Sequence, residues 1–146
     1  MIPSAVILPP ALRRAIEAAA KAAYPHEACG LLLGRRGEGG LLTIEDWRPA
    51  TNIHPEPTRH FELDPATHFA VLREMRGRND GLEVMGHVHS HPQGRAEPSA
   101  RDLEMAWDPA MLWLILAVGA DGAGALTAWK PENGQFHEVV IKNEAE

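Results

Sequence analysis

The first regular pattern along the chain is a run of helix-forming residues between positions 11 and 23. Its apolar side chains recur at the three- or four-residue spacing of one helix face. These positions are Leu12, Ile16, Ala19 and Ala23. Pro10 lies where a helix can begin, and Pro25 sets the end because the residue before a proline avoids the helical region. The pattern predicts an amphipathic helix over residues 11–23.

Two further helices are predicted later in the chain. Asp64 followed by Pro65 is typical of a helix start, with the Asp64 carboxylate as the N-cap. The apolar stripe of this helix would be Phe69, Leu72 and Met75. A third, short helix is predicted over residues 99–107.

Short apolar or alternating runs bounded by glycine, proline and asparagine predict strands between and after these helices. The runs are residues 29–33, 41–47, 60–63, 82–89, 111–118, 126–129 and 136–141. Helices interspersed with strands, followed by a run of strands, favour an α/β or α+β domain built on a mixed sheet. We find no repeat, linker or low-complexity tract, so the pattern predicts a single domain over residues 1–146.

Composition and charge exclude several classes of protein. The chain has 146 residues, of which 45% are hydrophobic and 23% charged, as in an ordinary globular domain. Its net charge of -6 argues against a general nucleic-acid binder, which normally carries a basic face. The longest apolar run, residues 111–120, is about half of what a membrane-spanning helix needs, so we expect no membrane partner.

The number of cysteines and the first residues of the chain give an indication of the cellular compartment. Cys29 is the only cysteine, so an intramolecular disulfide and an all-cysteine zinc site are both excluded. Residues 1–8 lack the charged start and long apolar run of a signal peptide. These features predict a cytoplasmic protein and leave open whether it is a monomer or a homo-oligomer.

The candidate chemistry lies in the segment Gly86-His87-Val88-His89-Ser90-His91-Pro92, followed by Ser99-Ala100-Arg101-Asp102. Side chains two residues apart on an extended chain point the same way, so His89 and His91 can converge on one ion. A carboxylate from a neighbouring helix would add a third ligand and leave the fourth tetrahedral position open, as in catalytic zinc sites. Ser99 and Asp102 also form a helix capping box, which would explain both residues without any chemistry.

The combined pattern closely resembles the signature of the JAMM (MPN-plus) zinc metallopeptidases. That signature is matched by His89-Ser90-His91, seven residues, Ser99, two residues and Asp102. The family also has an upstream glutamate, and Glu27 leads here into the glycine-bounded apolar strand Gly30-Leu31-Leu32-Leu33-Gly34. The resemblance covers essentially the whole chain and implies a three-layer, cytidine-deaminase-like α/β domain with a mixed central sheet.

The resemblance implies one zinc ion per chain, held by His89, His91 and Asp102. It implies that Glu27 is the general base and acid acting on water, and that Ser99 stabilises the oxyanion. The short loops resemble compact prokaryotic Mec-plus members, which implies a peptidase or isopeptidase acting on a small ubiquitin-like or sulfur-carrier protein with a Gly-Gly C-terminus.

Two other functions are open to a chain of this fold. A non-catalytic MPN-type interaction scaffold would lack the ligands, whereas this sequence keeps all three together with Glu27 and Ser99. A zinc deaminase would require His-x-Glu and Pro-Cys-x-x-Cys motifs, which a chain with one cysteine cannot supply. The remaining histidines are expected at the surface or around the site, with His87 nearest to it in sequence.

Overall fold

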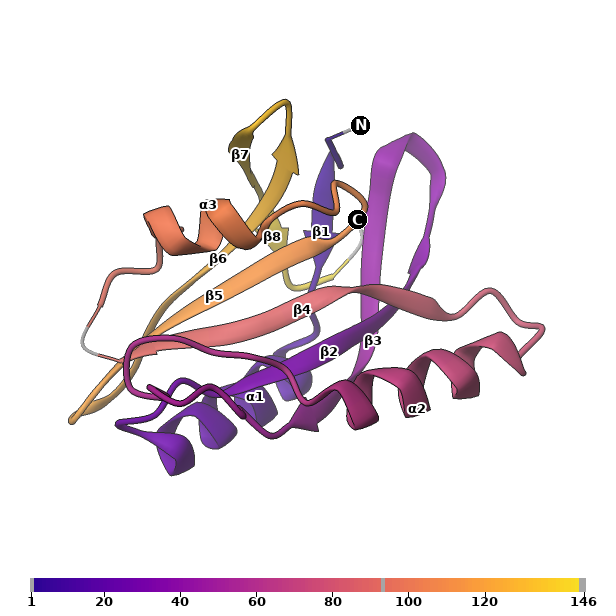
Figure 1. The fold of residues 1–146 in the computed structure, drawn as a ribbon. Helices are drawn as coiled ribbons and strands as arrows, with labels where there is room; N and C mark the ends of the chain where they lie inside the picture. Colours follow the sequence, from indigo (N-terminus) through magenta and orange to yellow (C-terminus); the bar gives the residue numbers. More distant parts are fainter. Residues whose placement is uncertain (1, 93, 145–146) are drawn as a thin grey trace.

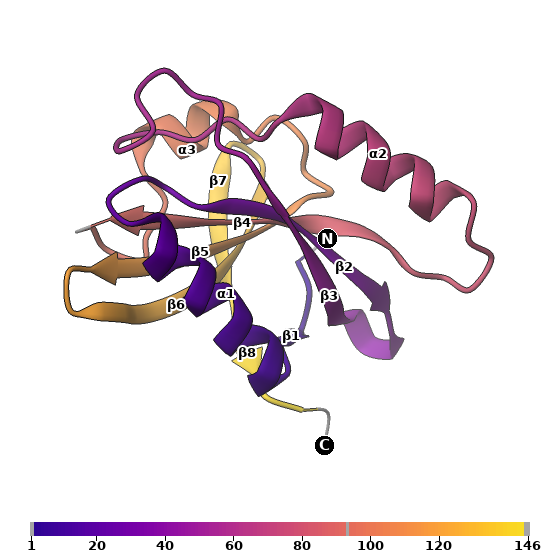
Figure 2. The ribbon, with the colours of Figure 1, turned by 90° about the horizontal axis from the view of Figure 1, so that it is seen from below.

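The computed structural model describes residues 2–92 and 94–144, and its strands form one mixed sheet between two layers of helix. The strand order is β7-β6-β5-β4-β2-β3-β1-β8. Helix α1 lies on one face of the sheet, and α2 and α3 lie on the other (Figures 1 and 2). This arrangement confirms the expected mixed α/β fold with helices on both faces of a central sheet.

The bounds of the elements follow the chain order. The helices are α1 (Pro10–Ala23), α2 (Pro65–Arg76) and α3 (Ala100–Met105), with a 3-10 turn η1 (Glu38–Gly40). The strands are β1 (Ala5–Ile7), β2 (Cys29–Arg36), β3 (Leu41–Ala50), β4 (Glu83–Pro92), β5 (Leu112–Gly119), β6 (Gly122–Glu132), β7 (Gln135–Val139) and β8 (Ile141–Lys142).

The sheet curls until its two edges meet. Only Val140 separates β7 from β8, although these strands lie at opposite ends of the strand order. The carbonyl of Val140 accepts a hydrogen bond from the Val6 amide of β1 at 2.8 Å. The curved sheet and α1 enclose the larger core, to which α1 contributes Ile16 and Ala20. A second, smaller core lies under α2.

Strand β4 is central, because it pairs with antiparallel β2 on one side and parallel β5 on the other. Gly86 allows the close approach to β5, where it is the register partner of Leu112. Side chains alternate between the two faces of a strand, so His87, His89 and His91 all point to the face that carries α2 and α3. The carboxyl end of β4 therefore delivers the candidate ligands to one side of the sheet.

Most of the predicted elements are confirmed, but three predictions are wrong in detail. Residues 60–63 form no strand, and only Leu63 makes an isolated bridge, to Asn52. Of the predicted stripe, α2 buries Met75, whereas Leu72 is half-buried and Phe69 is 67% exposed; Val71 is buried in their place. The predicted strand over residues 136–141 is two strands, β7 and β8.

The predicted start of α2 agrees with the structure. Asp64 caps α2 by accepting a hydrogen bond from the Ala66 amide at 3.1 Å. Within residues 2–92 and 94–144, no helix has the length and apolar character needed to cross a membrane.

A substitution at Gly86 tests the close pairing of β4 and β5. A Cβ at this position would overlap the carbonyl oxygen of Leu112 and lie 2.7 Å from its nitrogen. Overpacking a tight site costs roughly 1–3 kcal/mol, and we expect Gly86→Ala to lower the free energy of unfolding by a value near the upper end of that range. The reason is that neither backbone can move away without breaking the pairing of β4 with β5. For a chain of this size, 3 kcal/mol lowers Tm by roughly 6–12 °C in a thermal melt.

Gly119→Ala is the matched control. Gly119 is the last residue of the core strand β5, and a Cβ there meets no atom of the described residues within 4 Å. Equal melting temperatures for the two variants would contradict the close approach at Gly86.

Candidate metal centre and catalytic cavity

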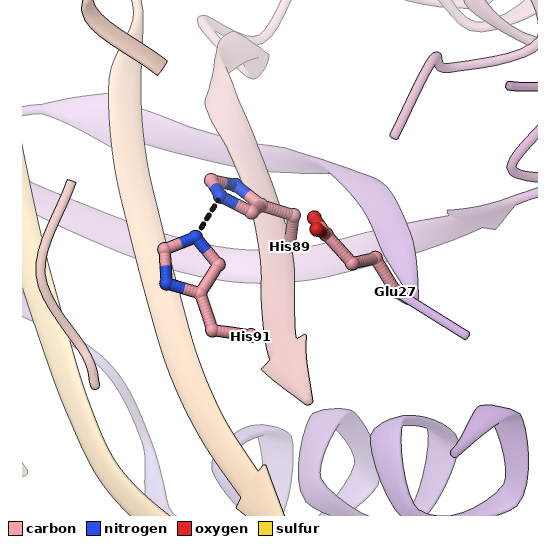
Figure 3. Close-up of side chains that lie close together, drawn as sticks. All are labelled: Glu27, His89 and His91. Atoms are coloured by element: carbon pink, nitrogen blue, oxygen red, sulfur yellow. Dashed lines mark hydrogen bonds between the residues drawn. The ribbon is translucent and has the colours of Figure 1, made fainter. Parts of the chain in front are cut away.

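Two imidazoles and the Asp102 carboxylate meet above the carboxyl end of β4. The Nε2 atoms of His89 and His91 lie 3.0 Å apart (Figure 3). Asp102 Oδ1 is 3.5 Å from His89 Nε2, and Asp102 Oδ2 is 3.2 Å from His91 Nε2. Ligands of a tetrahedral zinc ion with bonds of about 2.0–2.1 Å lie about 3.3 Å from one another. The three predicted ligands thus have separations that fit such an ion.

Glu27 belongs to the same cluster. It lies two residues before the start of β2, is buried, and places a carboxylate oxygen within 4.8 Å of ligand nitrogens of His89 and His91 (Figure 3). Glu27, His89 and His91 therefore form a group that could hold a metal ion. Two imidazoles and two carboxylates converge here. A tetrahedral metal site with one open position needs three protein ligands, so four groups are one more than it requires.

Ser90 holds the Glu27 segment against the histidine strand. Its Oγ accepts a hydrogen bond from the Ala28 amide at 2.8 Å, and its own amide donates to the Ala28 carbonyl at 2.9 Å. Ser90 lies between the two histidines in sequence, but its side chain leaves the opposite face of β4. The residue next to Glu27 is therefore tied to the strand that carries His89 and His91.

The two imidazoles are oriented by different contacts. His91 Nδ1 lies 2.8 Å from the carbonyl oxygen of Arg95, which can only accept, so Nδ1 carries the hydrogen and donates. His89 is fully buried and stacks on Phe61, with ring centroids 4.3 Å apart and planes at 18°. The edge of Trp113 packs against it from another direction. Ring packing thus fixes His89, whereas a hydrogen bond fixes His91.

Ser99 and Asp102 form the capping box that their spacing predicts. Ser99 Oγ accepts from the Asp102 amide at 3.0 Å, and Asp102 Oδ2 accepts from the Ser99 amide at 2.8 Å. The carboxylate that caps α3 is the same one that faces the two imidazoles. The structural and chemical interpretations of Asp102 are therefore compatible, because the cap orients the carboxylate.

The pKa values of the two carboxyl groups diverge. Burial raises the pKa of Glu27 to about 7, against a lowering by His91 and with a further increase from Asp102. Burial alone would raise the pKa of Asp102 too, but hydrogen bonds with His89 and His91 hold that pKa well below its usual range. One carboxyl group of the cluster is firmly ionised, and the other can exchange a proton near neutral pH.

The pKa values of the two histidines also diverge. Burial lowers the pKa of His89. Burial also opposes protonation of His91, but the contacts with Asp102 and the Arg95 carbonyl outweigh it and raise the His91 pKa.

A cavity of about 290 Å³ opens beside this cluster. It is lined by Glu27, Thr58, Arg59, His60, Phe61, His91, Pro92, Gly94, Ser99 and Asp102. One wall is the loop before α2, and another is the start of α3 with the segment that leads into it. Four of the five predicted site residues line this cavity; the fifth, His89, is fully buried and contacts the lining residues His91 and Phe61.

The loop wall contains residues that the sequence did not single out. Asn52 organises the loop, because its Nδ2 donates to the carbonyls of Glu27 at 3.0 Å and His60 at 2.9 Å. Its Oδ1 accepts from two backbone amides further along the loop, both at 3.0 Å. Phe61, predicted to lie in a strand, instead packs on His89. The sequence does not reveal the roles of Asn52 and Phe61, because both residues are neighbours of the histidine motif in space but not along the chain.

Two other candidates near the site are structural. His87 is buried against Trp113 and Phe61, and its Nδ1 has no hydrogen-bond partner among the described residues. Burial and the nearby Glu27 raise the pKa of the Cys29 thiol to about 12, so this residue is no nucleophile near neutral pH.

Three relatives with described activities are similar over most of the chain. The desampylase of Haloferax volcanii is 31% identical over 117 residues, which cover 80% of this chain and 78% of that protein. A probable TtuB-protein conjugate cleaving protease of Thermus thermophilus is 33% identical over 119 residues, covering 80% and 70%. The CysO-cysteine peptidase of Mycobacterium tuberculosis is 30% identical over 130 residues, covering 89% and 85%.

A solved structure and a family profile agree with these relatives. The solution structure of protein DSY2949 from Desulfitobacterium hafniense matches with a TM-score of 0.80 and 31% identity, covering 97% of this chain and 95% of that one. The profile of the prokaryotic homologs of the JAB domain matches residues 9–132. The chain therefore belongs to this family of prokaryotic JAB-domain homologs, the JAMM family that its histidine motif resembles.

Proposed function

We propose that this chain is a zinc-dependent peptidase or isopeptidase that cleaves after the Gly-Gly C-terminus of a small ubiquitin-like or sulfur-carrier protein. The observation that carries the proposal is the convergence of His89, His91 and Asp102, with Glu27 within reach of the same point. The relatives named for cleaving a TtuB conjugate and a CysO-cysteine bond support the substrate class. The lone, buried Cys29 is compatible with activity in the reducing cytoplasm.

In this proposal His89, His91 and Asp102 hold one zinc ion per chain. Bound zinc supplies Lewis-acid polarisation of the scissile carbonyl and makes water easier to deprotonate. Asp102 suits the ligand role because hydrogen bonds keep its carboxyl group ionised. The imidazoles suit it because their Nε2 atoms face each other and the carboxylate.

Glu27 takes the proton of the attacking water and passes it to the leaving amine. A general base works best when its pKa lies near the working pH, and burial brings the pKa of Glu27 to about 7. The proton must reach the amine, since an amide nitrogen leaves poorly as an anion. We assign both transfers to Glu27 because its carboxyl group is buried and lies within reach of the two imidazoles.

Ser99 donates a hydrogen bond to the oxyanion that forms on the scissile carbonyl. Its Oγ already accepts a hydrogen bond from the Asp102 amide. A hydroxyl has one hydrogen to donate in addition to its lone pairs, so capping α3 leaves the donor function available. Removing one such donor costs about 10²–10³ in rate in other acyl-transfer enzymes.

The first test of the proposal is metal content. We expect about one zinc per wild-type chain and almost none in His89→Ala/His91→Ala, because the double variant leaves a single predicted ligand. Elemental analysis of the purified proteins measures this. His137→Ala in β7 is the control and should keep its zinc; equal zinc in the wild type and the double variant would exclude the assigned ligands.

A second test separates the base from the ligands. Glu27→Gln should lower kcat by about 10²–10⁴, the usual contribution of a general acid–base residue, while zinc content and Tm stay close to wild type. Kinetics, elemental analysis and melting are measured on one preparation, with Glu17→Gln on α1 as the control. Loss of zinc from Glu27→Gln would instead make Glu27 a ligand, and a wild type without turnover on any conjugate would favour the non-catalytic scaffold.

The third test concerns the tail of the substrate. The cavity lies between the loop at residues 58–61 and the start of α3, so a tail without Cβ atoms can approach the cluster most closely. Carrier adducts ending in Gly-Gly or Ala-Ala, each linked to cysteine or lysine, are offered and the products followed by mass spectrometry. We expect kcat/KM to fall roughly 10- to 100-fold for Ala-Ala, from a steric cost of about 1–3 kcal/mol. Equal values would refute the narrow passage but not the zinc chemistry.

A further inference from the structure

The orientation of His91 depends on the backbone of the segment between β4 and α3. His91 Nδ1 donates to the Arg95 carbonyl at 2.8 Å, which leaves Nε2 facing His89 and Asp102. The ring of His91 meets that of His89 only in a tilted contact, with centroids 4.8 Å apart and planes at 59°, which is looser than the stacking of His89 on Phe61. A shift of the Arg95 carbonyl would therefore release His91 to other rotamers and to the other tautomer.

This segment is tied to strand β6 by a directed pair of hydrogen bonds. Thr127 Oγ1 lies 2.6 Å from the Ala96 carbonyl oxygen, which can only accept, so the hydroxyl donates. Trp129 Nε1 donates to the same Oγ1 at 2.8 Å. Accepting from the indole leaves the threonine hydrogen directed at Ala96, and successive hydrogen bonds of this kind polarise one another.

The register of the sheet explains why β6 can reach the site. His89 of β4 is the partner of Ile115 in β5, and Ile115 is the partner of Thr127 in β6. Directly paired residues point to the same face, so Thr127 projects toward the side that carries His89 and α3. Two positions along, His87, Trp113 and Trp129 form the next row on that face.

We propose that Thr127, oriented by Trp129, is a positioning residue for the zinc ligand His91, and this rests on the zinc site proposed above. Thr127 fixes Ala96, the peptide before it presents the Arg95 carbonyl, and that carbonyl holds His91 in the tautomer with a free Nε2. Ala96 is buried, so its carbonyl has little access to water if the threonine hydroxyl is lost. Partners that orient a ligand in this way typically change metal affinity by about 10- to 100-fold.

The test is the zinc dissociation constant, measured by chelator competition on the full chain. We expect Thr127→Val to bind zinc about tenfold more weakly, because valine keeps the shape of the side chain and loses the hydroxyl. Thr127→Ser should restore affinity to within about twofold, since it restores the donor. Thr43→Val, at a half-buried threonine of β3, is the matched control and should bind zinc as the wild type does.

Trp129→Phe separates positioning from general stability. It removes the indole N–H together with part of the ring, so any packing loss appears in Tm, and it should weaken zinc binding less than Thr127→Val. In the double variant Thr127→Val/Trp129→Phe, affinity should equal that of Thr127→Val alone, because the two bonds form one chain. Tm is recorded for every variant, and the affinity change should not follow it.

Three results would overturn the inference: wild-type zinc affinity in Thr127→Val, no recovery in Thr127→Ser, or independent additive losses in the double variant. If instead the wild-type chain binds no zinc, the zinc site of the proposed function fails and this inference fails with it. The wild-type titration therefore distinguishes the two failures.

Discussion

The pairing of β4 on both of its edges is the constraint on which the site depends. A strand hydrogen-bonded to β2 and to β5 cannot slip, because a shift of one residue would exchange its two faces. His89 and His91 must therefore point to one side, and Ser90 between them to the other. Ser90 uses that opposite position to bind the backbone of Ala28, which brings Glu27 to the same end of the strand. One register thus places three of the five site residues.

The remaining two residues reach the cluster through a helix start. Helix capping and metal ligation usually involve different side chains. At α3, one orientation of a single carboxylate satisfies both. Asp102 Oδ2 accepts from the Ser99 amide and still lies 3.2 Å from His91 Nε2. A capping interaction stabilises a helix by about 0.5–2 kcal/mol, so part of the cost of fixing this carboxylate is met by folding itself. A ligand held in place before the ion arrives loses little conformational freedom when it binds.

The sequence predicted what local patterns encode. The histidine motif, the capping box and the central strands all follow from spacing within a dozen residues. The alternation of Phe61 and Leu63 predicts a strand, but it reflects two separate packing partners: Phe61 stacks on His89, and Leu63 packs against the core under α2. Strand β1 has three residues and is held in the sheet by parallel pairing with residues 41–43 of β3 and residues 141–142 of β8, both far along the chain. The role of Thr127 likewise depends on the register of strands that no local pattern specifies.

The charges within the cluster support different roles for its two carboxylates, Asp102 as a zinc ligand and Glu27 as the general base. Two buried carboxyl groups beside two imidazoles repel each other unless protons or a cation compensate them. Protons can do so, since the pKa of His91 is raised and the pKa of Glu27 is raised to about 7. A divalent cation would replace these protons, since imidazoles and carboxylates coordinate only through free lone pairs. Asp102 needs no proton removed and can coordinate directly, whereas Glu27 has a proton affinity close to neutrality, which suits a residue that accepts a proton and then returns it.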